Sequence, residues 1–447
     1  MGCMRKSILT CFLLLILAVN FFAVCFLISD TAAQTTPNVY IGIDVAYGGV
    51  NEAKAAIDRV SAFTNLVVIG STGVTWFQNR VNETFQYAYE KGLSVISLRP
   101  SLLDYSAAEL NETEWFDMAQ NRWGDRLLGF YILDEPGGRQ IDGKFEWAWN
   151  NFTGQPTSYQ QAASMYTEGV SRFLSSERAP LNYPYKAFTS DYALYWYDYK
   201  AGYDAVFAEM GWNYSKQIYM SLCRGAAEAQ NKQWGAIITW SYTGSPWMES
   251  GEELYNDMVL AYDNGAKYII VFDSNEQGGS TLTQEHYDAI QRFWNYALTN
   301  QPKTTPKYLR TAYVLPNAWG FGFRWPTDHI WGVWEADALA PNITKSVGTL
   351  FDVYGDKLDI IYDDGSIVGN DGYRELIYWN AYDPTPTPSP SPSPSPTPVP
   401  SPTISPTPEP PASELLTMIA TVAVIAIPAV IASALLFNHY KKHKNQV

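Results

Sequence analysis

The chain has 447 residues and a formal net charge of −15, and 17% of its residues are charged. This length is ample for a folded part with a large core and for additional segments outside it. The excess of acidic residues argues against nucleic acid as a partner, because phosphate backbones bind basic surfaces.

The N-terminal segment has the pattern of a secretory signal peptide. Arg5 and Lys6 precede an apolar run over residues 8–28, and small residues follow at 31–33. A basic start, an apolar middle and a small-residue end predict that residues 1–33 are removed on export. An uncleaved membrane anchor is the alternative, because the apolar run is longer than the usual length of about 7–15 residues.

Cysteine use agrees with export of the body. Cys3, Cys11 and Cys25 lie in the signal segment, so Cys223 alone remains and no internal disulfide is predicted. Its helical surroundings predict an inert core position for Cys223. Sequons make surface glycosylation a further prediction, and they begin at Asn82, Asn111, Asn151, Asn213 and Asn342.

Residues 37–302 alternate between strand-like and helix-like patterns. Continuous apolar runs, typical of strands buried on both faces, cover residues 39–46, 66–71, 93–98, 127–133, 185–190, 205–210, 236–240 and 268–272. Helical periodicity follows most of them, over residues 52–63, 81–91, 159–174, 217–229, 252–263 and 284–298. Eight strand–helix units predict an α/β protein with the (β/α)8 architecture of a TIM barrel.

One unit departs from this pattern. Only about a dozen residues separate the fifth and sixth predicted strands, which is short for a crossover helix. Either this unit is degenerate or one strand is assigned wrongly. A doubly wound open sheet is therefore the alternative fold.

The segments after the barrel differ in composition. Residues 303–383 are rich in tryptophan, include a strand-like run at 358–362, and predict a small α/β appendage. Residues 384–412 alternate Pro with Ser and Thr, which predicts an extended, disordered stalk. Residues 415–437 are long and apolar enough to span a bilayer, and the basic tail 438–447 places the C-terminus in the cytoplasm.

The fourth predicted strand ends in two adjacent acids, Asp134 and Glu135, followed by Pro136 and two glycines. In a parallel barrel the chemistry lies at the carboxyl ends of the strands. A carboxyl group at the end of an apolar strand and beside another acid has its pKa raised by desolvation and like charge. Glu135 is therefore the candidate general acid. Asp134 and Glu209, at the end of the sixth strand, are candidates to stabilise the positive centre or to activate water.

The other predicted strand ends supply candidate ligand-binding residues. Carboxylates, an arginine and aromatic rings suit a sugar, whose ring faces stack on aromatics and whose hydroxyls bond to charged groups. The substrate-binding candidates are Asp44, Arg99, Asp191, Tyr195, Trp240, Tyr242, Asp273 and Glu276. No histidine or cysteine spacing suggests a metal, and no nucleotide fingerprint is present, so no cofactor is predicted.

Each candidate also has a structural interpretation. The acids before Pro136 could simply begin a helix, where Pro and negative charge are both favourable. Glu209 could form an ion pair with Arg99 or Lys216, and Asp44 and Asp273 could hydrogen-bond the barrel rim. The tryptophans of residues 303–383 are expected to pack the appendage, with sugar binding as the alternative.

The run Tyr131-Ile132-Leu133-Asp134-Glu135-Pro136 resembles the fourth-strand motif of TIM-barrel glycoside hydrolases, and its adjacent acids are similar to those of hexosaminidase-type families. This resemblance implies that Glu135 is the acid/base and that Asp134 assists the substrate's acetamido group. The seventh predicted strand departs from the larger retaining clan, because Ile238-Thr239-Trp240-Ser241-Tyr242 contains no acid.

These observations lead to three hypotheses. The first is a membrane-anchored extracellular glycoside hydrolase that acts on glycans by carboxylate acid/base catalysis. The second is a non-catalytic carbohydrate-binding receptor or adhesin on a barrel scaffold, since barrels do not dictate activity. The third is a structural cell-envelope protein. The predicted partners are a glycan and, through the C-terminal helix, the lipid bilayer.

Overall fold

The computed structural model describes residues 36–100, 110–143, 154–211, 214–238, 248–275, 277–367 and 369–381. The predicted signal peptide, stalk, membrane span and cytoplasmic tail lie outside these ranges. Among the described residues, no helix has the length and apolar character that a bilayer crossing requires.

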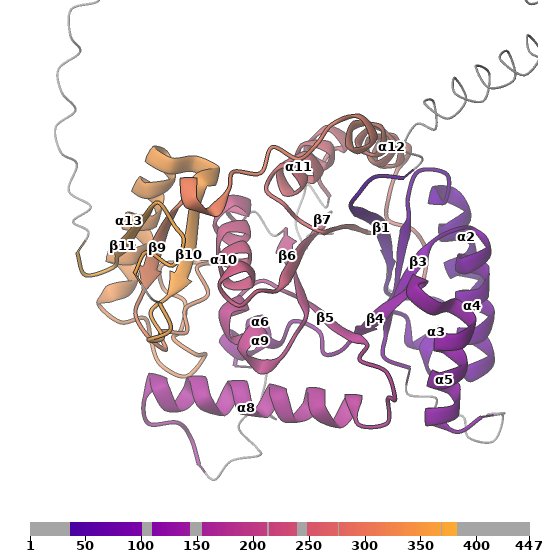
Figure 1. Ribbon diagram of the computed structural model, residues 1–447, viewed down its shortest axis with the longest axis horizontal. Helices are drawn as coiled ribbons and strands as arrows, with labels where there is room; N and C mark the ends of the chain where they lie inside the picture. The colour runs from indigo at the N-terminus through magenta and orange to yellow at the C-terminus, as the bar shows by residue number, and fades with distance from the viewer. Residues whose placement is uncertain are drawn as a thin grey trace, which may run out of the picture. The chain divides into compact units, whose positions relative to one another are not determined.

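Eight parallel strands close into a barrel in the order in which they occur along the chain (Figure 1). The closed barrel confirms the predicted architecture, and the doubly wound open sheet is wrong. The strands are β1 Tyr40–Val45, β2 Leu66–Ile69, β3 Ser94–Leu98, β4 Leu127–Tyr131, β5 Lys186–Asp191, β6 Ala205–Met210, β7 Gln233–Ile238 and β8 Tyr268–Phe272.

Helices surround the barrel. The short spacing between the fifth and sixth strands is explained by α9, a helix of seven residues, so this unit is abbreviated but present. The helices of the barrel are α2 Val50–Val60, α3 Thr72–Thr75, α4 Gln78–Glu90, α5 Glu112–Trp123, α6 Pro136–Ile141, α8 Tyr159–Arg178, α9 Tyr195–Ala201, α10 Lys216–Ala229, α11 Gly251–Asp263 and α12 Gln284–Thr299, and a 3-10 turn, Gly124–Arg126, precedes β4.

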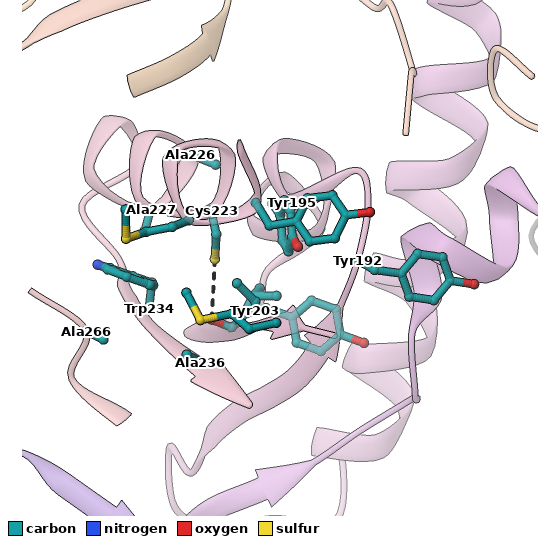
Figure 2. Packing of buried hydrophobic residues seen from close by; sticks show 14 of the residues in the cluster. Tyr192, Tyr195, Tyr203, Cys223, Ala226, Ala227, Trp234, Ala236 and Ala266 are labelled. Carbon is teal, nitrogen blue, oxygen red and sulfur yellow. Dashed lines mark hydrogen bonds between the residues drawn. The ribbon is translucent and has the colours of Figure 1, made fainter. Parts of the chain in front are cut away.

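Strand alternation divides the buried side chains into two layers, because successive residues of a strand face opposite sides of the sheet. One layer fills the barrel and includes Val68, Phe188, Phe207 and Ile270. The other lies between the strands and the helices. Figure 2 shows part of it around Cys223 of α10, whose buried thiol donates to the carbonyl oxygen of Val206 on β6 at 3.6 Å.

The tryptophan-rich segment forms a second, smaller sheet of three parallel strands in the order β10-β9-β11. Its strand β10 packs against barrel helix α10. Its elements are the 3-10 turn Lys307–Leu309, β9 Thr311–Leu315, α13 Leu339–Tyr354, the 3-10 turn Gly355–Lys357, β10 Leu358–Tyr362 and β11 Glu375–Tyr378.

A buried ion cluster joins this appendage to the barrel. Arg224 of α10 donates to Asp359 of β10 at 2.7 Å, and Arg310, just before β9, pairs with the other carboxyl oxygen of Asp359 at 2.8 Å. All three side chains are almost completely buried. Buried charges are tolerated only when they are paired, so this contact fixes the appendage on α10.

The tryptophans of the appendage divide into two groups. Trp319 and Trp331 are fully buried in the core, where packing accounts for them. Trp325, in the loop after β9, is 58% exposed and is not part of that core.

Candidate active site

Strand alternation carries three polar side chains to the carboxyl-terminal end of the barrel interior. On β6 the interior residues Ala205 and Phe207 are followed two positions on by Glu209. On β5 the same spacing leads from Phe188 to Ser190, and on β1 two such steps lead from Tyr40 through Gly42 to Asp44. The apolar interior therefore ends in a polar layer at the end where parallel barrels carry their chemistry.

The acids after β4 enter this layer through a sharp turn. The strand ends at Tyr131 rather than at Leu133 as the sequence predicts. Leu133 and Glu135 both have positive φ, at 60° and 49°. A left-handed backbone is costly for such residues and is typical of functional sites. Because the chain bends here, Asp134 is exposed while Glu135 is partly buried.

Asp191 fixes the turn that presents Glu135. It is the last residue of β5 and, next to inward-facing Ser190, its side chain points toward the helices. Its carboxyl oxygens accept from the backbone N–H groups of Gly137 at 2.5 Å and Gly138 at 2.7 Å, in the first turn of α6. Both positions require glycine, since a Cβ on Gly138 would lie 2.1 Å from the ring of Tyr192.

The structural interpretation of the acid pair is therefore partly correct. Glu135 is the N-cap residue of α6 and Pro136 is its first residue. The Glu135 side chain, however, makes no capping hydrogen bond. It lies instead in hydrogen-bonding contact with the carboxyl group of Glu209.

Burial, rather than this contact, is the main cause of the altered acidity of both residues, because the hydrogen bond with Glu209 lowers the pKa of Glu135. Desolvation raises the pKa of Glu135 to about 8, and the negative charges of Asp134 and Asp191 add to the effect. Burial, followed by the charge of Glu135, raises the pKa of Glu209 well above its usual range. Oε2 of Glu209 is buried and receives no donor from the described residues, so a proton on Glu135 can satisfy it. Two acids that share a proton titrate as a pair.

A chain of hydroxyl groups links Glu209 to Asp134. Ser190 Oγ donates to Glu209 Oε1 at 2.6 Å and lies 2.8 Å from the hydroxyl of Tyr131. The Tyr131 hydroxyl donates to Asp134 Oδ1 at 2.6 Å. Tyr131 and Ser190 were not predicted as site residues, although strand alternation from Phe188 could have identified Ser190.

Asp44 joins the same group of acids. Desolvation, with a smaller effect from the charge of Asp134, raises the pKa of Asp44 to about 8. Its Oδ1 is buried without a hydrogen-bond partner among the described residues. Asp44 therefore has a carboxyl oxygen that can accept a further hydrogen bond. Asp273, in contrast, hydrogen-bonds the rim of the barrel, as one interpretation of the sequence predicts. The Asp273 carboxyl group accepts from Thr281, Leu282, Ser280 and Tyr287 in the segment after β8.

Besides Asp273, three more of the predicted substrate-binding residues have structural partners. Asp191 faces α6, as described above. Arg99 forms ion pairs with Glu112 at 2.7 Å and Glu177 at 2.8 Å, because its long side chain turns outward from the end of β3. Tyr195 is buried in α9, edge-on to the ring of Tyr219 (Figure 2 shows its place beside Cys223).

The ion pair considered for Glu209 does not occur. Arg99 is engaged as described, and Lys216 pairs with Glu249 and Asp257. Trp240, Tyr242 and Glu276 lie outside the described residues. Of the sequons, Asn111 and Asn342 are exposed, Asn82 is partly buried and accepts from the indole of Trp115, and Asn151 and Asn213 are not described.

Exposed aromatic rings lie at the same end of the barrel, and the sequence did not single them out. Tyr47 follows β1 and Trp76 follows α3, and each is 43% exposed. Within the described residues, no group of His, Cys, Asp or Glu is arranged to hold a metal ion. The site is therefore a set of carboxyl groups, Asp44, Asp134, Glu135 and Glu209, with aromatic rings around it.

Comparisons with known proteins find only remote structural similarities. No family model and no curated protein sequence matches this chain. Among solved structures, the GH5_18 protein of Streptomyces cattleya in complex with GlcNAc is 12% identical, with a TM-score of 0.45 over 77% of this chain and 99% of that chain. An α-L-fucosidase of Paenibacillus thiaminolyticus is 11% identical, with a TM-score of 0.45 over 76% of this chain and 59% of that one.

A GH20 module of a pneumococcal exo-β-D-N-acetylglucosaminidase is 9% identical, with a TM-score of 0.37 over 59% of this chain and 84% of that one. Similarities this low identify neither a family nor a substrate. The barrel itself is established by the strand order of this chain. Any assignment of activity depends on the geometry of the acids.

Proposed function

We propose that this protein is a glycoside hydrolase in which Glu135 donates a proton to the oxygen of the scissile bond. The observation that supports this most strongly is the state of Glu135. It is held in a left-handed backbone conformation, makes no capping bond, contacts a second carboxyl group, and has a pKa of about 8. A general acid must carry its proton at the working pH, and few surface carboxyl groups do.

Two neighbouring acids can stabilise the positive charge that develops on the sugar. Asp134 is exposed at the mouth and is oriented by the hydroxyl of Tyr131. Glu209 contacts Glu135 directly, which leaves no space for a water molecule between them. That contact is closer than the carboxyl separations of about 5–5.5 Å in retaining enzymes and roughly 6.5–9.5 Å in inverting enzymes, so neither stereochemical outcome is proposed.

We further propose that the enzyme acts outside the cell on a membrane anchor. This part of the proposal depends on sequence alone: the export signal at 1–33, the Pro-rich stalk at 384–412 and the apolar segment at 415–437 with its basic tail. Protease treatment of intact cells tests it, because the body should be shaved from the surface while the basic tail stays protected.

A carbohydrate-binding receptor without activity is the second candidate. The absence of an acid in Ile238-Thr239-Trp240-Ser241-Tyr242, where the larger retaining clan carries its nucleophile, favours it. The raised pKa of Glu135 opposes the receptor hypothesis, since a site that only binds sugar has no need of such an acid. A structural role in the cell envelope would leave the polar layer unexplained.

The test compares wild type with Glu135→Gln on a panel of 4-nitrophenyl glycosides and on oligosaccharides, with reducing-end release as readout. Loss of a general acid should reduce the rate about 10²–10⁴-fold. Glu335→Gln is the control, because that side chain is 89% exposed and far from the acids in sequence. Undiminished turnover in Glu135→Gln would remove the proposal. Glycan binding without turnover by wild type would select the receptor.

A further inference from the structure

Trp325 is an exposed indole in a loop that also contains several buried aromatic rings. It lies between β9 and α13, and 58% of its surface is exposed. Trp319, Phe321 and Phe323 in the same loop are buried; Phe321 stacks on Trp319 and meets Phe323 edge-on. An isolated exposed aromatic needs no explanation by itself. The contacts that hold Trp325 in place are what make it informative.

The backbone on either side of Trp325 is fixed by a buried acid. The carboxyl group of Asp328 accepts from the backbone N–H of Arg324 at 2.9 Å and from that of Trp325 at 3.4 Å. It also binds the guanidinium group of Arg324 through both carboxyl oxygens, at 3.0 and 3.3 Å. The loop is therefore a rigid support for the indole.

The same arginine connects this loop to the barrel. Arg324 Nη1 donates to Asp142 Oδ1 at 2.5 Å, and the hydroxyl of Tyr192 donates to Asp142 Oδ2 at 3.0 Å. Asp142 is the C-cap of α6, the short helix whose N-cap is Glu135. The six residues of α6 span about 9 Å. This short helix therefore connects Asp142, which binds Arg324, to Glu135, the proposed general acid.

A second contact places Trp325 beside the strand that carries Glu209. The ring of Tyr214, in the segment that follows β6, meets the ring of Trp325 edge-on, with centroids 5.5 Å apart. Tyr214 packs in turn against Tyr219 at the start of α10. Trp325 is thus positioned from two sides, after β4 and after β6, both at the carboxyl-terminal end of the barrel.

We propose that Trp325 is an aromatic platform on which a pyranose ring of a glycan stacks, supplied by the appendage to the mouth of the barrel. This inference rests on the proposed function and extends it. Asp142, which holds the arginine next to Trp325, lies the length of α6 from Glu135, so Trp325 would bind a sugar beyond the one that is cleaved. The ligand class is therefore a glycan chain of several units rather than a free monosaccharide or a single-sugar conjugate.

The experiment measures binding to a glycan array and, for each glycan bound, its affinity as a function of chain length. It uses the full chain in detergent, with Glu135→Gln as background so that no ligand is consumed. In that background Trp325→Ala should weaken binding of the longer glycans about tenfold, equivalent to 1.4 kcal/mol, and leave single-sugar ligands unchanged. Trp325→Phe should restore most of the loss, since a ring face is retained.

Tyr308→Ala is the matched control. Tyr308 is 66% exposed and lies in the 3-10 turn before β9, whereas the loop of Trp325 follows the other end of that strand. If Trp325→Ala and Tyr308→Ala bind long glycans equally well, the platform is excluded while the proposed hydrolase stands. If Trp325→Ala binds less but wild type shows no turnover, the platform stands and the hydrolase fails. Absence of all glycan binding overturns both, and a changed oligomeric state with unaltered glycan binding assigns Trp325 to a protein contact.

Discussion

The carboxyl group of Glu135, which follows β4, meets that of Glu209 on β6 across β5, the strand that separates them in the barrel. Ser190 of β5 bonds to Glu209 at 2.6 Å, and Asp191, the next residue, holds the turn of Glu135 from the other face of the strand. One strand end therefore supports both acids, through two adjacent residues that point to opposite sides. The predictions below follow from this arrangement.

Asp134→Asn should move the alkaline limit of activity to lower pH. The pKa of Glu135, about 8, is raised first by desolvation and next by the charge of Asp134. Activity that needs protonated Glu135 falls as pH rises through that pKa. Removing the charge of Asp134 lowers the pKa of Glu135, so activity falls at a lower pH. The measurement is the pH profile of kcat/KM on a glycoside that wild type cleaves. Asp288→Asn, at an exposed position on α12, is the control, and an unmoved limit in Asp134→Asn would contradict the account.

Tyr131→Phe should reduce kcat about tenfold or more, because Asp134 loses the hydroxyl group that orients it and the link to Ser190 is broken. The variant also loses roughly 1 kcal/mol of stability with the hydrogen bond. Tyr185→Phe separates the two effects. Tyr185 lies just before β5, at the other end of the barrel, and its hydroxyl group donates to the carbonyl oxygen of Phe116. Equal activity in the two variants would show that the Tyr131 hydroxyl is only structural.

Asp44→Asn should stabilise the protein at alkaline pH and change little in acid. Folded Asp44 keeps its proton up to about pH 8, whereas an unfolded aspartate loses it near pH 4. Wild type therefore loses free energy of unfolding as pH rises from about 4 to 8, and the amide variant does not carry this component. Thermal unfolding at about pH 5 and about pH 9 measures it. A melting temperature that rises equally at both values would contradict the raised pKa.

Asp359→Ala should destabilise the protein by about 3–5 kcal/mol, because it leaves two buried guanidinium groups, Arg224 and Arg310, without this partner. Urea unfolding of the purified body measures the loss. Glu252→Ala is the matched control: it removes the exposed pair with Arg292 and should leave the unfolding midpoint close to that of wild type. Similar midpoints for the two variants would mean that the appendage is held by apolar packing alone.

The barrel strands could be predicted from the sequence because continuous apolar runs report burial on both faces. The position of Glu135 at a strand end could be predicted for the same reason. Its left-handed backbone and its contact with Glu209 could not, because neither follows from residue type or spacing. The ion pairs of Arg99 could not be predicted either, since periodicity locates a Cα but not the direction of a long, flexible side chain.

The tryptophans of the appendage also show that residue type alone does not predict the role of a side chain. Composition predicts that most of them pack the appendage, as Trp319 and Trp331 do. Trp325 has the same residue type and lies in the same loop. Trp325 differs from Trp319 and Trp331 in its exposure and in the hydrogen bonds of Asp328 and Arg324 that hold its loop. Arg324 also bonds to Asp142 of the barrel, a tertiary contact that residue type does not reveal.

The central claim is that Glu135 keeps its proton at neutral pH and shares it with Glu209. A carbon-13 NMR titration of glutamate side-chain carboxyl groups, with Glu135 assigned through Glu135→Gln, measures this directly. The account predicts a Glu135 resonance that titrates near pH 8 and moves again when Glu209→Gln is introduced. Titration near pH 4.5, as in an ordinary glutamate, with no response to Glu209→Gln, would contradict it.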